Sequence, residues 1–257
     1  MIYKRVAARL KAQDWLAITI EIGIVVIGVF VGTLVANWNQ DRVGKREVTK
    51  LLDQMRPQLA QTQLIDASEQ VYYATTRRYA DTALAGWARD PQVSDPRVSD
   101  QDFVIAAYQA SQITGNATDG QNIALVLGGD QIRQIDDPVL RKAVMRMIMF
   151  DYQTISVGSM QTRYREDVRQ IIPDVIQQRI RAGCGDRRQA NGFLFLPPAC
   201  SVELDPGLVS ATAAALRARP ELQRELQFHL AQVATFLLNV DGLEQRVDQL
   251  SALLDKR

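Results

Sequence analysis

Residues 15–38 read WLAITIEIGIVVIGVFVGTLVANW, an apolar stretch that begins and ends with tryptophan and contains one carboxylate, Glu21. The hydrocarbon core of a bilayer is about 30 Å thick and takes roughly 20 helical residues to cross, a length that residues 16–36 supply. Trp15 and Trp38 then stand where interfacial aromatic residues are enriched. The stretch predicts a single transmembrane helix over residues 15–38, with the lipid bilayer as its first partner.

Basic residues flank this stretch on both sides. They are Lys4, Arg5, Arg9 and Lys11 before it, and Arg42, Lys45, Arg46 and Lys50 after it. The basic tail, residues 1–14, resembles the start of a secretory signal, but the apolar run exceeds the usual length of about 7–15 residues, and Leu34-Val35-Ala36 is a poor cleavage site. We therefore expect a retained anchor, with cleavage as the alternative. Equal numbers of basic residues leave the positive-inside rule undecided.

Two cysteines bear on the orientation. Cys184 and Cys200 bracket a loop rich in glycine and proline, which a disulfide could close, and such a bond would form in an oxidising compartment. Two buried reduced thiols are the alternative, and the four-ligand zinc pattern is absent. We expect a cytoplasmic N-terminus and a periplasmic domain over residues 39–257, in the inner (plasma) membrane of a bacterium.

Composition narrows the remaining classes. The domain after the anchor has a length typical of one folded unit. Its charge is nearly balanced, since the chain carries 30 Lys and Arg against 29 Asp and Glu, so nucleic acid is not an expected partner.

The apolar spacing predicts an all-α fold, a bundle of long helices behind the anchor. One long helix should run out of the membrane from Arg42 to about Ala88, with a kink at Pro57. Ser99, followed by Asp102, is typical of a helix start and precedes the apolar stretch 103–113. A turn is expected at 115–120 and a short helix at 122–127.

The second half should contain two more long helices. Asp137-Pro138 offers an N-cap and a first-turn proline, and the 3.6-residue period then runs from Leu140 to Ile172, with a kink at Pro173. Residues 193–196 should form a short extended plug in the cysteine loop. The last helix starts at Pro220 and carries an apolar stripe that needs a partner helix.

Within the anchor, small residues follow the carboxylate. At 100° per residue, Gly28 and Gly32 lie within about 20° of Glu21 on the helix wheel, and Ala36 extends the row. We call Glu21, Gly28, Gly32 and Ala36 the anchor stripe. Small residues let helices approach closely in a membrane, so the stripe predicts contact with a second copy or another membrane protein. Snorkelling of Glu21 to the headgroups is the alternative.

The anchor also carries a resemblance. Glu21-Ile-Gly-Ile-Val-Val-Ile-Gly28, followed by Asn37-Trp38-Asn39, resembles the signature of a bacterial domain-of-unknown-function family, family 6090, over about 25 residues. Its members share a basic N-terminus, an E-I-x-x-V-V-I-G anchor and an N-W-N exit. Leu140-Arg141 and the stretch 164–173 are loosely similar to the family's helical domain. The resemblance implies a single-pass membrane protein with a helical domain and no known activity.

Signals for catalysis are weak. The single histidine, His229, lies one turn from Leu226 and Val233 and is expected at the edge of the core, with a base or ligand role as the alternative. Metalloprotease, Walker A, dinucleotide and nucleophile-elbow motifs are absent, and we expect no cofactor, no metal site and no catalytic residue. Four aspartates, Asp90, Asp95, Asp100 and Asp102, are read as helix caps, with a calcium cluster as the alternative.

Four aromatic residues of the first long helix are expected in the core, with a ligand pocket as the alternative. They are Tyr72, Tyr73, Tyr79 and Trp87. The sequence thus favours a membrane-anchored helical protein, not an enzyme, that acts through protein contacts in assembly, as an adaptor or in regulation. A ligand-sensing bundle that relays to a membrane partner is the first alternative, and a hydrolase with an unrecognised site is the second.

Overall fold

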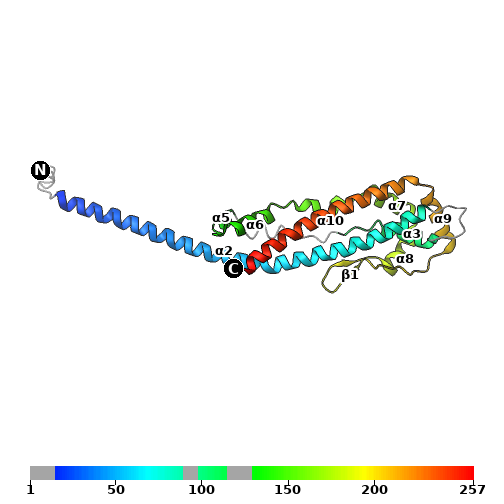
Figure 1. Ribbon diagram of the computed structural model, residues 1–257, viewed down its shortest axis with the longest axis horizontal. Coiled ribbons are helices and arrows are strands. Elements are labelled where there is room, and N and C mark those ends of the chain that lie inside the picture. Colours follow the sequence, from blue (N-terminus) through cyan, green and yellow to red (C-terminus); the bar gives the residue numbers. More distant parts are fainter. Residues whose placement is uncertain (1–14, 89–97, 115–128) are drawn as a thin grey trace, which may run out of the picture.

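The computed structural model describes residues 15–88, 98–114 and 129–257, and it is almost entirely helical. One helix projects alone from an elongated bundle and then continues along the bundle's whole length (Figure 1). The predicted all-α class is confirmed. The basic tail, the turn at 115–120, the short helix at 122–127, and Asp90 and Asp95 lie outside the described residues.

The projecting helix is α2, Trp15–Trp87, which runs for 73 residues without a break. Pro57 lies inside it and does not end it. In the bundle, α2 buries one residue at alternating steps of four and three, the spacing of a left-handed supercoil. These positions are Val48, Leu52, Met55, Leu59, Thr62, Asp66, Glu69, Tyr73, Thr76, Ala80 and Ala83. The predicted long helix out of the anchor is confirmed.

The last helix, α10, Pro220–Asp255, returns alongside α2 in the opposite direction (Figure 1). Its buried side chains include Leu226, Leu230 and Val233, as the stripe predicted. At its C-terminal end, the Arg56 guanidinium of α2 donates hydrogen bonds to the Asp255 carboxylate and the Leu254 carbonyl. Arg56 thereby satisfies one of the carbonyls that a helix end leaves without a partner.

Helix α3, Asp100–Gln109, is the most deeply buried short helix, packed against α2 and α9. The Ser99 hydroxyl accepts a hydrogen bond from the Asp102 amide at 3.0 Å, so the predicted cap is confirmed. The Phe103 ring meets the edge of Trp87 with centroids 5.0 Å apart. The far end of α2 is fixed by this contact.

The single long helix predicted from Leu140 to Ile172 is wrong. The chain forms α6, Pro138–Ile148, two 3₁₀ turns, η1 and η2, Tyr152–Ile155 and Val157–Met160, then α7, Arg163–Ile171, and α8, Asp174–Cys184. The start of α6 is as predicted, because the Asp137 side chain accepts from the Val139 and Leu140 amides.

Local polar groups cause the breaks. The Asp151 carboxylate accepts from the Gln153 amide and so caps a new turn after α6. Pro173 separates α7 from α8 because it has no amide hydrogen to continue the helix. Gln177 compensates by donating 2.7 Å hydrogen bonds to the Arg169 and Ile172 carbonyls.

Two helices were not predicted. They are α5, Gly129–Arg133, and α9, Pro206–Arg217. Helix α9 starts like α6, with Asp205 capping through a 2.7 Å bond from the Leu208 amide and with proline in the first turn. The cysteine loop contains strand β1, Arg187–Arg188, paired antiparallel to β2, Leu194–Phe195, which agrees with the expected extended plug.

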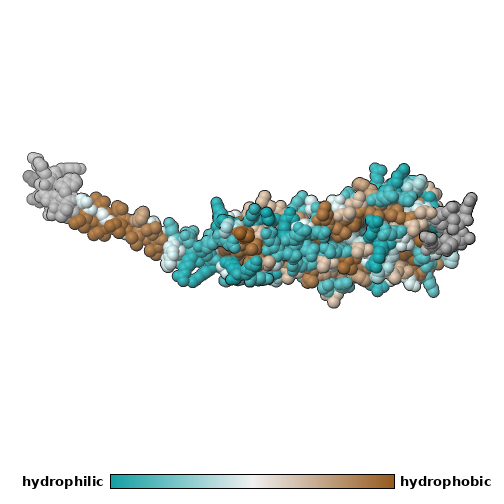
Figure 2. Space-filling model, in the orientation of Figure 1, coloured by the Kyte–Doolittle hydropathy of each residue, from teal (hydrophilic) through white to brown (hydrophobic). Residues whose placement is uncertain are grey.

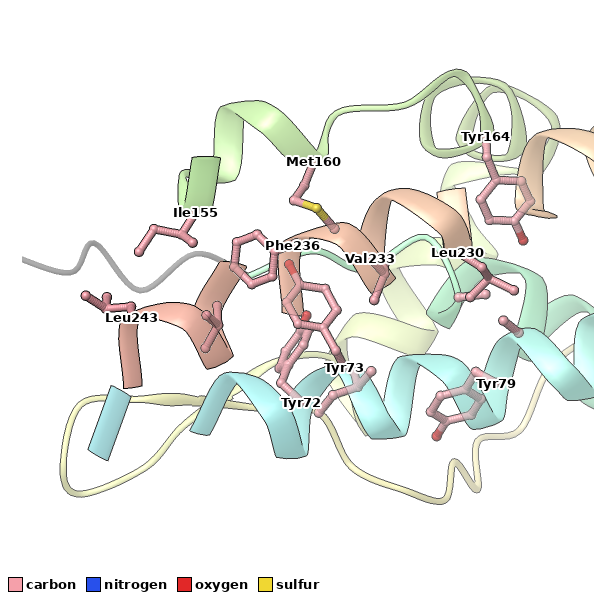
Figure 3. Packing of buried hydrophobic residues seen from close by; sticks show 14 of the residues in the cluster. Tyr72, Tyr73, Tyr79, Ile155, Met160, Tyr164, Leu230, Val233, Phe236 and Leu243 are labelled. Atoms are coloured by element: carbon pink, nitrogen blue, oxygen red, sulfur yellow. The ribbon is translucent and has the colours of Figure 1, made fainter. Parts of the chain in front are cut away.

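The bundle core is rich in aromatic rings. Tyr72 and Tyr73 of α2 point toward Phe236 of α10, and the Tyr73 and Phe236 centroids are 5.1 Å apart (Figure 3). Tyr79 is also buried, and Trp87 is half-buried with its indole N–H donating to the Leu216 carbonyl at 3.1 Å. The expected core role of these aromatic residues is confirmed.

Candidate functional site

The apolar stretch of α2 lies outside the bundle. The side chains from Ile20 to Trp38 are exposed nearly throughout, and Figure 2 shows an almost continuous hydrophobic surface on this part of the helix. Its length and composition allow it to cross a membrane. A Cβ atom added at Gly28 or Gly32 would meet nothing within 4 Å. No described part of the bundle covers the anchor stripe, and its contact with another helix remains a prediction.

A polar collar follows the apolar stretch. Trp38 is 64% exposed, and the Arg42 guanidinium lies 5.8 Å from the centroid of its ring. Lys45 and Arg46 continue the basic surface, and Lys45 donates to the Asp136 carboxylate at 2.8 Å. This hydrogen bond links α2, at the point where it enters the bundle, to the loop before α6.

A cavity of about 400 Å³ opens at the same end of the bundle. Its apolar lining includes Val48 and Leu140. Its charged lining is mixed, with the basic residues Lys45, Lys256 and Arg257 and the acidic residues Asp136 and Asp137. Arg257 also donates to the Thr49 hydroxyl at 2.9 Å. The chain end therefore closes one wall of the cavity.

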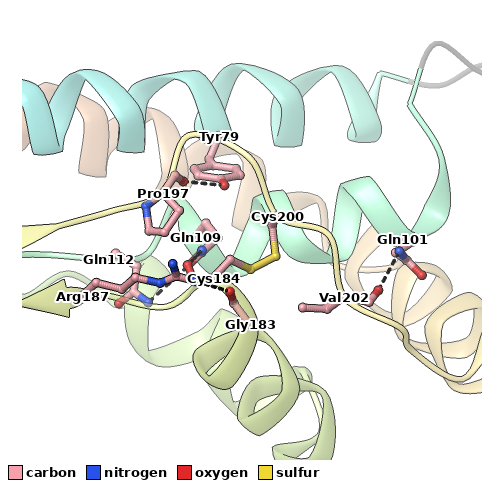
Figure 4. Close-up of a disulfide and its surroundings, with 10 residues drawn as sticks. All are labelled: Tyr79, Gln101, Gln109, Gln112, Gly183, Cys184, Arg187, Pro197, Cys200 and Val202. Atoms are coloured by element: carbon pink, nitrogen blue, oxygen red, sulfur yellow. Dashed lines mark hydrogen bonds between the residues drawn. A yellow bond between two sulfur atoms is a disulfide. The ribbon is translucent and has the colours of Figure 1, made fainter.

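Cys184 and Cys200 form a disulfide with Cα atoms 5.3 Å apart (Figure 4). The possible disulfide of the sequence analysis is thus present. Several hydrogen bonds fasten the loop it closes to the helices. Among them, Gln109 donates to the Cys184 carbonyl at 2.6 Å, and Tyr79 donates to the Pro197 carbonyl at 2.8 Å. The loop is therefore packed on the bundle through Phe193, Leu196 and Pro197, while residues 186–191 are exposed.

Two arginines of α7 form a polar cluster that the sequence did not reveal. Arg165 donates to the Ser111 carbonyl, and Arg169 donates to the Ser111 hydroxyl at 3.1 Å and to Gln112 Oε1 at 2.8 Å. The Arg169 guanidinium also lies 4.8 Å from the Tyr108 ring centroid. Burial and the nearby Arg165 charge lower the pKa of Arg169. The spacing of four residues on one helix face was the available signal.

The most unusual buried group is Asp66 in the middle of α2. Its side chain is 0% exposed, and neither carboxylate oxygen has a hydrogen-bond partner. Burial, followed by the charges of Glu244, Asp241 and Asp248 on α10, raises the pKa of Asp66 to about 7. Two glutamines flank it: Gln63 donates to Asp248 at 2.6 Å, and Gln70 to Asp241 at 3.1 Å.

His229 was expected at the edge of the core, and it lies fully inside it. It is fully buried on α10, and its Nδ1 lies 2.9 Å from the Thr162 hydroxyl oxygen. Burial, with a smaller effect of Arg165, lowers the pKa of His229 to about 4, so the ring is neutral at pH 7. A hydroxyl beside an imidazole is an arrangement that hydrolases use. Here Thr162 is also buried, and a substrate would not reach the pair.

The acidic residues in the first turn of α3 interact with neighbouring side chains. Asp100 pairs with Arg217 at 2.8 Å, and Asp102 accepts a 2.7 Å hydrogen bond from the Ser99 hydroxyl. Among the described residues, no group of three or more His, Cys, Asp or Glu side chains is placed to hold a metal ion. For Asp100 and Asp102, pairing and capping explain the positions without calcium.

No protein-family model matches the chain, and the comparisons with curated proteins and with solved structures found no match. The resemblance to family 6090 therefore stays a prediction.

Proposed function

We propose that this chain is a single-pass membrane protein that acts through protein contacts, as an adaptor or assembly factor. The observation that carries the proposal is the continuity of α2, which passes from the exposed apolar stretch into the bundle core without a break. A domain joined in this way is held in a fixed orientation relative to its anchor, whereas a flexible linker would leave it free to turn.

The proposed place is a bacterial inner membrane, with the N-terminus cytoplasmic and the bundle periplasmic. The disulfide between Cys184 and Cys200 supports an oxidising compartment for the bundle. Trp38 and Arg42 support a lipid headgroup boundary at this point of α2, because indole rings and basic side chains are favoured there.

The anchor stripe is the proposed contact surface within the bilayer. A bare apolar helix has no hydrophobic reason to associate in lipid, so small residues and polar groups drive such contacts. Glu21, Gly28 and Gly32 provide both on one side of α2. The partner is a second copy of the chain or another membrane protein.

A ligand-sensing bundle is the second candidate function, and the cavity at the base of the bundle favours it. Lys256 and Arg257 would attract a small anion there, whereas Lys45 is paired with Asp136. Helix α2 passes this cavity, so an anion bound there would lie against the helix that enters the membrane. A thermal-shift screen of the full chain in detergent against small anions tests it, and a rise in Tm that Lys256→Glu abolishes would support it.

In-cell crosslinking followed by affinity capture tests the proposed contact. Gly28→Leu places bulk on the anchor stripe, and Gly23→Leu makes the same change about 200° around the helix from Glu21. We expect the crosslinked partner or dimer to fall with Gly28→Leu and with Glu21→Ala, and to persist with Gly23→Leu. Equal recovery from all variants would remove the stripe from the proposal.

A further inference from the structure

A second surface lies on the side of the bundle, where α6 and η1 meet α10. It is an open groove of about 870 Å³, and we call it the α6–α10 groove. Its apolar lining comes from Met145, Met149 and Phe150, and its basic lining from Lys142, Arg146 and Arg246. It was not predicted from the sequence, because it exists only where two distant segments pack together.

The apolar lining is unusually accessible. Met149 is 75% exposed and Met145 is 38% exposed. Methionine side chains are flexible and polarisable and are common on surfaces that bind apolar faces of partner helices. Phe150 makes an edge contact with Tyr152, with centroids 5.0 Å apart. The groove therefore combines a packed aromatic ring with flexible, exposed methionine side chains.

The basic lining is not neutralised by the protein. Within the described part of the chain, Lys142, Arg146 and Arg246 form no ion pair. Arg246 instead lies 4.9 Å from the Phe150 ring centroid. The one carboxylate on the groove, Asp151, is engaged with the Gln153 amide. The excess of positive charge favours an acidic partner.

The spacing of the lining suits a helix. Lys142 and Arg146 are four residues apart along α6, and so are Met145 and Met149, so a basic row and an apolar row run side by side over about two turns. An amphipathic helix presents its own side chains at the same steps.

The height of the groove favours a protein over lipid headgroups. Asp248, beside the groove on α10, is level with Gln63 of α2, to which it is hydrogen-bonded. Along α2, Gln63 stands 25 residues beyond Trp38, or roughly 37 Å at 1.5 Å per residue. A headgroup layer at Trp38 would not reach that level.

We propose that the α6–α10 groove binds an acidic amphipathic helix of a partner protein, with the helix's apolar face on Met145, Met149 and Phe150 and its carboxylates on Lys142, Arg146 and Arg246. This inference rests on the proposed function and names a surface and a partner chemistry for it. The contact lies outside the anchor and does not depend on the anchor stripe.

Two fluorescent peptides of about 15 residues test it. Both form an amphipathic helix with one leucine face, and the other face is all glutamate in one and all lysine in its twin. Binding to the full chain in nanodiscs of neutral lipid is followed by fluorescence anisotropy at low salt, where charge pairing is strongest, and binding to empty nanodiscs is subtracted. We expect the glutamate peptide to bind and the lysine peptide to bind at least roughly tenfold more weakly, about 1.4 kcal/mol.

Matched variants locate the binding. The double variant Lys142→Glu and Arg146→Glu should weaken binding of the glutamate peptide at least roughly tenfold. Met149→Asn should weaken binding of this peptide too, but the glutamate peptide should still bind more tightly than the lysine peptide. Arg179→Glu and Val175→Asn make similar changes at exposed positions of α8 and should have no effect. Circular dichroism of each variant checks that it is folded.

The proposal is overturned if neither peptide binds, if both bind equally, or if the α8 variants weaken binding as much as the groove variants. Binding of lipid vesicles containing anionic headgroups that the groove variants abolish, without peptide binding, would also overturn it. Equal crosslinked recovery from all the anchor variants, together with intact peptide binding, would reject the anchor contact and keep the groove, so the two failures are distinct.

Discussion

The hydroxyl of Tyr72 on α2 donates a 2.7 Å hydrogen bond to Oδ1 of Asp186, two residues beyond Cys184. The neighbouring Tyr73 hydroxyl donates to the Thr114 carbonyl at 2.6 Å and accepts from the Thr114 amide at 3.2 Å. Two consecutive tyrosines thus attach the middle of α2 to two different loops.

These two hydroxyls should contribute unequally to stability. Tyr72→Phe leaves Asp186, which is exposed and can bind water, so we expect a loss of about 1 kcal/mol. Tyr73→Phe leaves a buried amide and carbonyl without their partner, and we expect a larger loss of about 2–3 kcal/mol. Urea unfolding of the full chain in detergent, followed by circular dichroism, measures both. Equal losses would contradict the difference in exposure.

Reducing the disulfide should destabilise the bundle. The bond joins residues 16 apart, and the entropy of closing such a loop corresponds to about 3 kcal/mol. We expect a lower Tm in reductant and no further effect of reductant on a Cys184→Ser and Cys200→Ser double variant. Maleimide should label both thiols only after reduction. Immediate labelling in non-reducing buffer would show that the bond is absent.

Asp66 should make stability depend on pH. Its pKa is raised to about 7 in the folded protein, against about 3.9 when unfolded, so folding takes up a proton between these values. The contribution of protonated Asp66 is fully present below pH 4 and is lost as pH rises toward and through 7. We expect Asp66→Asn to raise Tm at pH 8 and to flatten the change between pH 5 and 8.

Glu47→Gln is the matched control for Asp66, since Glu47 is an exposed acid on the same helix. It should leave the pH profile unchanged. A profile that Asp66→Asn does not alter would mean that Asp66 is charged or solvated in the folded protein.

Gly86 should not tolerate a side chain. A Cβ atom at this position would overlap the Phe103 ring, where α2 meets α3. We expect Gly86→Ala to lower the free energy of unfolding by about 1–3 kcal/mol, despite the better helix propensity of alanine. Gly129→Ala, where the added atom meets nothing within 4 Å, is the control. A stable Gly86→Ala protein would show that Phe103 can shift.

Local signals predicted the long helices and their starts. The heptad spacing of α2 and α10 and the caps at Ser99 and Asp137 depend on neighbouring residues, and each is found as expected. Asp205-Pro206 carried the same signal as Asp137-Pro138 and would have revealed α9. The long helix predicted through residues 149–162 failed because apolar spacing alone does not register a side-chain cap such as Asp151.

The candidate sites in the bundle could not be predicted from the sequence, because they depend on how distant segments pack together. Asp66 is one carboxylate among many in the sequence, and only the antiparallel packing of α10 sets Glu244, Asp241 and Asp248 near it. The α6–α10 groove likewise joins residues about a hundred positions apart. Arg165 and Arg169 reach Ser111 and Gln112 because α7 packs on α3. Such long-range meetings leave no periodic pattern in the chain.

The length of α2 also determines how far the bundle extends from the anchor. From Trp38 to Trp87 the helix rises through 49 residues, roughly 74 Å at 1.5 Å per residue. In the membrane topology that we propose, a neighbour with a short ectodomain would meet only the levels near Lys45 and the C-terminal residues. The end of the bundle around Trp87 and α9 lies so far from the anchor that only neighbours with long ectodomains, or proteins attached to an opposing surface, would contact it. Height alone would therefore sort the neighbours that each level of the bundle can meet.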